Sequence, residues 1–250
     1  MEIDYLQEPG RPRALHVLPK MEVPVAARPR VVAFDIVETT FSLESLRPRL
    51  SAQGIPDASL ETWFAQILRD AFALAATDTY AGFRDIAAAT LAEVARKHGR
   101  ELGEAGLDAV LNGFGQLDPH PDAAEAFRIL RSADVRIAAL SNGAAETTQA
   151  LLQRAGLSSL VERVISVAEI RQWKPRRGLY LHAAEVLGVT PAELALVATH
   201  AWDVHGAKCA GLFTGFVARG QSVPATMAAP DIVGQSLADV ASGFAAMPTK

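Results

Sequence analysis

The stretch VVAFDIVET, residues 31–39, opens with a short apolar run, residues 31–34, that ends at the carboxylate of Asp35. Apolar runs of this length, bounded by charged residues, are typical of strands buried on both faces of a parallel sheet. Ligands of such sheets bind outside the carboxyl ends of the strands. We therefore expect Asp35 to lie at the edge of the sheet where a site would form.

Further apolar runs follow along the chain and alternate with helical patterns. The runs cover residues 135–140, 164–167, 194–198 and 213–217. The helical patterns cover residues 122–132, 144–155, 178–187 and 202–210. Alternation of this kind predicts an α/β fold with a doubly wound parallel sheet, a Rossmann-type core. The predicted core spans residues 28–45 and 118–245.

Residues 46–117 interrupt this alternation with helical patterns alone. From Leu60 to Ala75 the apolar residues recur at the spacing of one helix face, and further helices are predicted at 83–98 and 105–114. A single connection between strand and helix does not need that length. We expect a helical cap domain, inserted above the end of the first strand, that excludes water from a site.

Composition limits the classes of partner. The chain has 250 residues, a net charge of -4 and no long run of one sign, so a small-molecule substrate is expected and no nucleic acid. No apolar stretch has the length of a membrane span, so no membrane partner is expected. A homodimer is an option. Residues 1–27 are interpreted as an N-terminal extension without an apolar signal segment.

The single cysteine, Cys209, cannot form an internal disulfide. This cysteine usage fits a reducing compartment, and we expect the cytoplasm. Cys209 precedes a glycine at the end of a predicted helix. We expect it to be a buried structural residue rather than a nucleophile.

Polar residues gather at the ends of the predicted strands. Together they offer a carboxylate, hydroxyl and amide donors, an ammonium group and a second carboxylate, which can form one site. Each residue alone also has a structural explanation, as a helix cap, a turn or an ordinary loop residue. The residues at these ends are Asp35, Ser141, Asn142, Lys174, Thr199, His200 and Asp203.

Four short segments, in this order and spacing, resemble the motifs of the haloacid dehalogenase superfamily. They are residues 34–39 (FDIVET), 141–143 (SNG), 174–175 (KP) and 201–203 (AWD). The resemblance covers residues 28–245. Within the superfamily, the second and fourth segments point to the type II 2-haloacid dehalogenase branch, which has a helical cap in this place.

The resemblance implies a hydrolase with a covalent ester intermediate, which converts a short 2-haloalkanoic acid to the 2-hydroxy acid. Asp35 would be the nucleophile, and Lys174 would offset carboxylate charge. Ser141, Asn142 and Thr39 would bind the substrate. By the same resemblance Asp203 would orient or activate the water, although it could also be the N-cap of the helix that follows.

Neither a metal nor a cofactor is expected. Phosphatases of the superfamily carry a second Asp two residues after the nucleophile, where this chain has Val37, and the nearby Glu38 is shifted by one. A halide leaves without being protonated, so its departure needs no general acid. Two alternatives stay open: a Mg²⁺-dependent phosphomonoesterase, and a related protein without haloacid turnover.

The chain departs from the branch at several positions. The cap Arg that receives the halide would follow Trp63, but Phe64 stands there, and Arg69 is expected to point elsewhere. Trp63 and Phe64 are still predicted to line the substrate pocket, with Trp202 as a further wall. His200 replaces an Asn and is predicted to be catalytic, either as a base or as a donor.

Overall fold

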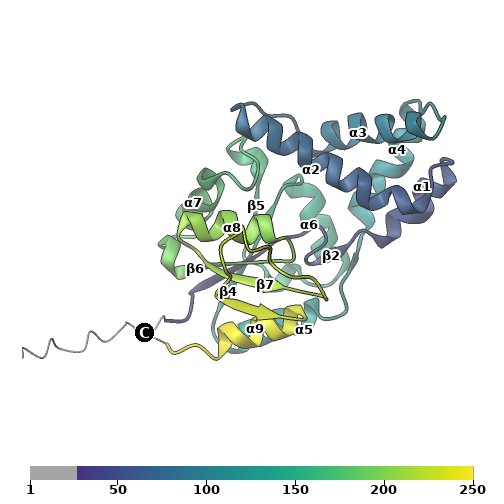
Figure 1. The fold of residues 1–250 in the computed structure, drawn as a ribbon. Coiled ribbons are helices and arrows are strands. Elements are labelled where there is room, and N and C mark those ends of the chain that lie inside the picture. Colours follow the sequence, from purple (N-terminus) through teal and green to yellow (C-terminus); the bar gives the residue numbers. More distant parts are fainter. Residues whose placement is uncertain (1–26, 250) are drawn as a thin grey trace, which may run out of the picture.

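Six parallel strands form the central sheet of the computed structural model, which describes residues 27–249 (Figure 1). Their order is β5-β4-β1-β6-β7-β8. Their bounds are β1 Val31–Phe34, β4 Arg136–Ser141, β5 Arg163–Ser166, β6 Leu194–Ala198, β7 Phe213–Val217 and β8 Ile232–Gly234. Phe34 pairs with Ala139 of β4 and Val197 of β6, so the residues after these three strands emerge side by side.

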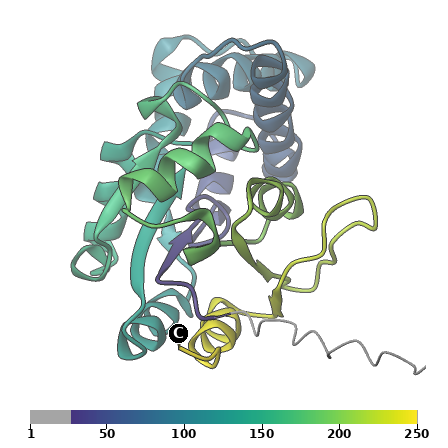
Figure 2. The ribbon, with the colours of Figure 1, turned by 90° about the vertical axis from the view of Figure 1, so that its left-hand side faces the viewer.

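Helices cover both faces of the sheet, as the doubly wound prediction requires. Val32 and Phe34 point to the face that holds α5 (Ala123–Ser132) and α9 (Leu237–Ala245). Figures 1 and 2 show these two helices side by side below the sheet. Val31 and Ala33 point to the opposite face, which holds α7 and α8. The remaining bounds are α6 Ala145–Arg154, α7 Arg177–Val186 and α8 Ala201–Ala210.

The helices of the cap stand above the sheet (Figure 1). They lie between β2 (Phe41–Ser42) and β3 (Asp118–Pro119), which form an antiparallel ribbon where the chain leaves and re-enters the core. The cap helices are α1 Arg47–Ala52, α2 Leu60–Ala76, α3 Phe83–Lys97 and α4 Glu104–Leu111. Single 3-10 segments cover Glu44–Leu46, Asp57–Ser59, Asn112–Gln116, Ser158–Leu160, Val167–Glu169 and Pro191–Glu193.

The segment after β5 ties the cap to the core. Trp173 is fully buried, and its Nε1 donates to the carbonyl of Ala81 at 3.0 Å. Arg176 donates from Nη1 to the carbonyl of Ala75 at 2.7 Å and forms an ion pair with Asp78 at 2.5 Å. Lys174, the lysine of the third motif, lies between these two anchors.

The predicted N-terminal extension, 1–27, lies outside the described residues except for Ala27. Among residues 27–249, no helix combines the length and the apolar character that crossing a membrane would require.

Cys209 is exposed, so the prediction that it is buried was wrong. Helix α8 buries Asp203, Val204, Gly206, Ala207 and Ala210, and position 209 falls on its other side. The sulfur lies 3.7 Å from Nε2 of His205 on the same helix. The prediction that the helix ends at a glycine is confirmed by the C-cap Gly211, but a helix end does not determine which side of the helix faces solvent.

Candidate active site

Asp35 follows β1 and is almost completely buried. Its Oδ1 accepts a hydrogen bond from Nζ of Lys174 at 3.0 Å, and its Oδ2 accepts one from Oγ1 of Thr39 at 2.7 Å. Burial alone would raise the pKa of Asp35, but Lys174, His200 and Thr39 outweigh it and hold the pKa well below its usual value. The carboxylate is therefore ionised at neutral pH, as a nucleophile must be.

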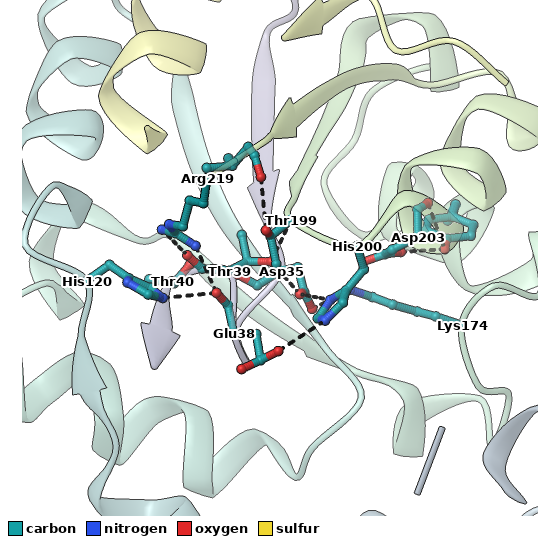
Figure 3. Close-up of polar contacts among 12 residues, drawn as sticks. Asp35, Glu38, Thr39, Thr40, His120, Lys174, Thr199, His200, Asp203 and Arg219 are labelled. Atoms are coloured by element: carbon teal, nitrogen blue, oxygen red, sulfur yellow. Dashed lines mark hydrogen bonds and ion pairs between the residues drawn. The ribbon is translucent and has the colours of Figure 1, made fainter. Parts of the chain in front are cut away.

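The loop after Asp35 is fixed by donors from distant parts of the chain (Figure 3). Glu38 has a left-handed backbone with φ 66°, which few residues other than glycine adopt without support. Its carbonyl accepts from the guanidinium of Arg219 at 2.9 Å and from Nε2 of His120 at 3.0 Å. Arg219 also donates to the carbonyl of Thr39 at 3.0 Å. These bonds hold the nucleophile loop in one geometry.

Lys174 is fully buried between two carboxylates. Its Nζ lies 3.0 Å from Asp35 and 2.8 Å from Asp203. Burial would lower the pKa of Lys174, but the two carboxylates outweigh it and raise the pKa, so the ammonium stays charged. A buried ion is stable only when it is paired and hydrogen-bonded in this way.

Asp203 is fully buried as well, and it also accepts a 2.6 Å hydrogen bond from the hydroxyl of Tyr180. Helix α8 begins at Ala201 with His200 as its N-cap, so the alternative that Asp203 is the N-cap is wrong. Burial raises the pKa of Asp203 even against the attraction of Lys174. The two bonds at its oxygens fix the carboxylate beside the nucleophile.

His200 lies between two carboxylates and against an aromatic ring. Its Nδ1 is 3.5 Å from Oδ2 of Asp35, and its Nε2 is 3.8 Å from the carboxylate of Glu38. The imidazole stacks on Trp202, with ring centroids 5.3 Å apart. Burial opposes its charge, but Asp35 and Glu38 outweigh burial and raise the pKa of His200 to about 9. In the resting site the ring is therefore an imidazolium and a donor.

Ser141 and Asn142 follow β4 and lead into α6. Oγ of Ser141 accepts from the backbone N–H of Gly143 at 2.9 Å, and Oδ1 of Asn142 accepts from the backbone N–H of Lys174 at 3.3 Å. Both residues also line a cavity between cap and core. The turn and the site explanations of this motif are thus compatible.

A chamber of about 10 Å³ lies directly at the nucleophile. Phe64 reaches it from the cap, and its ring centroid lies 5.8 Å from that of His200. Arg69 is exposed and pairs with Asp70 and Glu93, so the prediction that it points elsewhere is confirmed. The residues that line the chamber are Asp35, Val37, Phe64, Leu68, Phe83, Asn142, His200 and Trp202.

Known proteins are similar to this chain in sequence. The family of haloacid dehalogenase-like hydrolases matches residues 29–211. The chain is 34% identical to an (S)-2-haloacid dehalogenase of Xanthobacter autotrophicus over 192 residues, 76% of this chain and 75% of that protein. This chain belongs to the haloacid dehalogenase-like hydrolases.

Solved structures of haloacid dehalogenases show the same fold. The L-2-haloacid dehalogenase from Xanthobacter autotrophicus with chloropropionic acid covalently bound has a TM-score of 0.80 and 30% identity, and the match covers 87% of this chain and 99% of that chain. An (S)-2-haloacid dehalogenase 4A of Burkholderia cepacia is 28% identical over 74% of this chain and 81% of that protein. The resemblance to the 2-haloacid dehalogenase branch, predicted from the motifs, is confirmed.

In this haloacid dehalogenase-like hydrolase most predicted site residues lie together. Asp35, Thr39, Lys174, His200 and Asp203 form one connected polar cluster (Figure 3). Phe64, Ser141, Asn142 and Trp202 line the adjoining cavities. The roles of these residues stay predictions.

Trp63 does not lie with the others. It is fully buried inside the cap, where its Nε1 donates to the carbonyl of Ala87 and to Thr90, each at 3.1 Å. Consecutive helix residues differ by about 100° in direction, so Trp63 and Phe64 cannot both face the chamber. The prediction that Trp63 contacts the substrate is corrected to a packing role.

The sequence reading missed several supporting residues of this dehalogenase-like site. Arg219 follows the strand at 213–217, and the rule that polar residues gather at strand ends would have found it. Tyr180 carried a weaker signal, because a tyrosine in an amphipathic helix needs a partner for its hydroxyl when it is buried. Nothing in the sequence around His120 marks its contact with Glu38.

Proposed function

We propose that this protein is a hydrolytic 2-haloacid dehalogenase, which converts a short 2-haloalkanoic acid to the 2-hydroxy acid through an ester on Asp35. One observation carries the proposal: a buried, ionised carboxylate, bonded to the buried ammonium of Lys174, opens into a chamber under the cap. Relatives named (S)-2-haloacid dehalogenase support the choice of substrate class.

The first step is a displacement at the carbon that bears the halogen. An oxygen of Asp35 forms a bond to this carbon, and the halide leaves with the bonding electrons. Ser141 and Asn142, at the edge of the cavity, would hold the carboxylate of the substrate. Lys174 keeps the nucleophile ionised and oriented during the attack.

His200 is the side chain best placed to receive the halide. Among the described residues that line the chamber it is the one with a positive charge, since Phe64 is apolar. A halide that leaves water for a low-dielectric pocket loses several kcal/mol of hydration unless donors meet it. The imidazolium supplies a charge and an N–H at this place.

The second step is hydrolysis of the ester. Water attacks the carbonyl carbon of the esterified Asp35, a base takes the proton of the water, and the 2-hydroxy acid leaves as the carboxylate is restored. Asp203 is the proposed base, and its raised pKa suits a carboxylate that accepts a proton. Esterification also removes the charge of Asp35, which lowers the pKa of His200 in the intermediate.

A comparison of substrates separates this proposal from its alternatives. Halide release from 2-chloropropionate and 2-bromopropionate should survive EDTA, because the side chain of Val37 has no oxygen and the ammonium of Lys174 already pairs with the carboxylates of Asp35 and Asp203. Phosphate release from phosphate esters that requires added Mg²⁺ would favour the phosphomonoesterase. The absence of both halide release and phosphate release would favour a protein without turnover.

A single turnover in H₂¹⁸O tests the ester itself. Label should appear in the carboxylate of Asp35, because water attacks the protein carbonyl. Mass spectrometry of the peptide that contains Asp35 would detect it, and the Asp35→Asn variant is the control. Label confined to the product would contradict the covalent route.

Cellular location and assembly stay proposals. The cytoplasm is supported by the single cysteine, which leaves no internal disulfide. We propose a small-molecule substrate and neither a nucleic-acid nor a membrane partner, because the chain has a net charge of -4 and no long run of one sign. A homodimer is the proposed assembly, and sedimentation in solution would test it.

A further inference from the structure

A second cavity of about 400 Å³ adjoins the chamber, between the cap and the core. Val37, Phe83 and Asn142 line both spaces, so the two are neighbours at the nucleophile loop. The walls that matter for its character are Tyr80, Leu111 and Phe114 from the cap and Ala144, Thr147 and Leu151 from the core. Leu111, Phe114 and Leu151 are buried there.

The chamber and the cavity differ in the size of the group that each can hold. The chamber of about 10 Å³ has room for about one water-sized group. It can take a halogen or a methyl group but no longer substituent. The cavity of about 400 Å³ lies in the range of ordinary small-molecule pockets. A longer side chain on the reacting carbon must therefore extend past Val37 into this cavity.

The lining of the cavity selects for apolar groups. Its polar side chains at the nucleophile end are Ser141 and Asn142, which the proposed reaction uses for the carboxylate of the substrate. Among the described residues that line it, Arg84 carries the charge, and this side chain is half exposed and paired with Asp108 at 2.5 Å. The other polar side chains that line it, Tyr80, Asn112, Thr147 and Thr148, are neutral, so a charged tail would lose hydration in the interior without an ionic partner.

We propose that this cavity binds an apolar tail of the substrate, so that the substrate class extends to 2-haloalkanoic acids of medium chain length. The inference rests on the proposed function for the reaction at Asp35. Val37 is then the residue that sets access, because it stands between the reacting carbon and the space for the tail.

Binding of unhalogenated carboxylates tests the cavity without any turnover. Titration calorimetry with propionate, butanoate, hexanoate and octanoate should give an affinity that rises roughly threefold to fourfold for each methylene buried. An affinity that does not change with chain length would overturn the inference. In that case the cavity would be only a water-filled entrance.

Two variants locate the tail. Val37→Phe narrows the passage and Thr147→Trp fills the cavity from α6, so each should lower the ratio of octanoate to propionate affinity by at least tenfold. Val233→Phe makes the same change as the first variant at a side chain that is 60% exposed on β8, outside both spaces, and should leave this ratio unchanged. An unchanged ratio in both cavity variants would place the tail elsewhere and overturn the inference.

Halide release, measured in parallel with 2-bromopropionate and 2-bromooctanoate, separates the two proposals. Chain-length-dependent binding without halide release from either acid would reject the dehalogenase reaction and support the cavity. Release from 2-bromopropionate with binding that is independent of length would support the reaction and overturn the cavity.

Discussion

His200 lies beside the nucleophile, and its charge changes with pH in the alkaline range. Its pKa is raised to about 9, so the ring is charged below that pH and loses its charge as the pH rises through it. The pKa of Asp35 is held low, so the nucleophile stays ionised throughout this range. The ascending half of a pH profile near neutrality would then have to come from another group.

We expect kcat/KM for 2-chloropropionate to fall as the pH rises through about 9, because the departing halide loses the imidazolium. His200→Asn should remove this descending limb. It should also slow halide release by about tenfold to a hundredfold, which corresponds to a charged contact worth a few kcal/mol at intermediate dielectric. Steady-state halide assays from pH 6 to 10 give both readouts. A variant that keeps the wild-type limb would assign it to a different residue.

Phe64 offers the complementary experiment from the cap side. In the His200→Asn background, Phe64→Arg should restore chloride release towards the wild-type rate, because a guanidinium would enter the same chamber. Leu68→Arg, which lies one turn further along α2 and lines the same space, is the matched control for charge without the position of Phe64. Equal recovery in both variants would show that the site needs only a nearby positive charge.

The nucleophile loop between β1 and β2 depends on Arg219, which follows β7. Arg219→Ala removes donors to the carbonyls of Glu38 and Thr39 and should lower the free energy of unfolding by about 1–3 kcal/mol. It should also reduce kcat, because Asp35 loses its fixed geometry. Denaturant unfolding and steady-state kinetics measure the two effects.

Arg69→Ala is the control for the arginine variant. Arg69 is exposed and forms ion pairs only on the surface of the cap, so its removal should change the stability by about 0–1 kcal/mol and leave kcat unchanged. A loss of stability without a loss of kcat in Arg219→Ala would mean that the nucleophile loop keeps its geometry without the hydrogen bonds from Arg219.

Strand and helix elements were predictable where burial imposes a strong pattern. The bounds of β1, β6 and β7 match the predicted runs, because interior strands of a parallel sheet are predominantly apolar. The edge strand β8 was missed, since it has 3 residues and its Val233 is exposed. The two-residue strands of the ribbon leave no periodicity to read.

The site was predictable only as far as topology fixes it. Strand ends in a parallel sheet meet, so Asp35, Lys174 and Asp203 could be placed together before the structure. The charge on His200 could not, because it results from distances to Asp35 and Glu38 that the sequence does not contain. Which of Trp63 and Phe64 lines the chamber depends on which side of α2 faces the core. The sequence does not distinguish the two residues, because both are aromatic.

At the scale of the whole molecule, one segment, residues 173–176, contacts both the core and the cap. Within residues 173–176, Lys174 binds Asp35 in the core, while Trp173 and Arg176 bind carbonyls of the cap. The position of the cap is thus tied to the segment that orients the nucleophile. Loosening the cap contacts should change substrate binding before it changes the chemistry.

Arg176→Ala removes the bond to the carbonyl of Ala75 and the ion pair with Asp78. We expect faster amide hydrogen exchange in residues 75–81 and a severalfold rise in KM with a smaller change in kcat. Arg47→Ala, which breaks ion pairs with Glu44 and Glu61 inside the cap, should leave exchange at residues 75–81 unchanged. Exchange at the wild-type rate in Arg176→Ala would show that Trp173 alone suffices as an anchor.

The stacking of Trp202 on His200 also has an optical consequence. A protonated imidazole quenches the emission of an indole in contact with it more strongly than a neutral one does. Trp63 and Trp173 are fully buried at other places and supply a steady background of fluorescence. Tryptophan emission should therefore brighten as the pH is raised through about 9. When Asp35 is esterified, the same brightening should move to lower pH. The fluorescence of Trp202 would then report both the protonation of His200 and the formation of the ester intermediate.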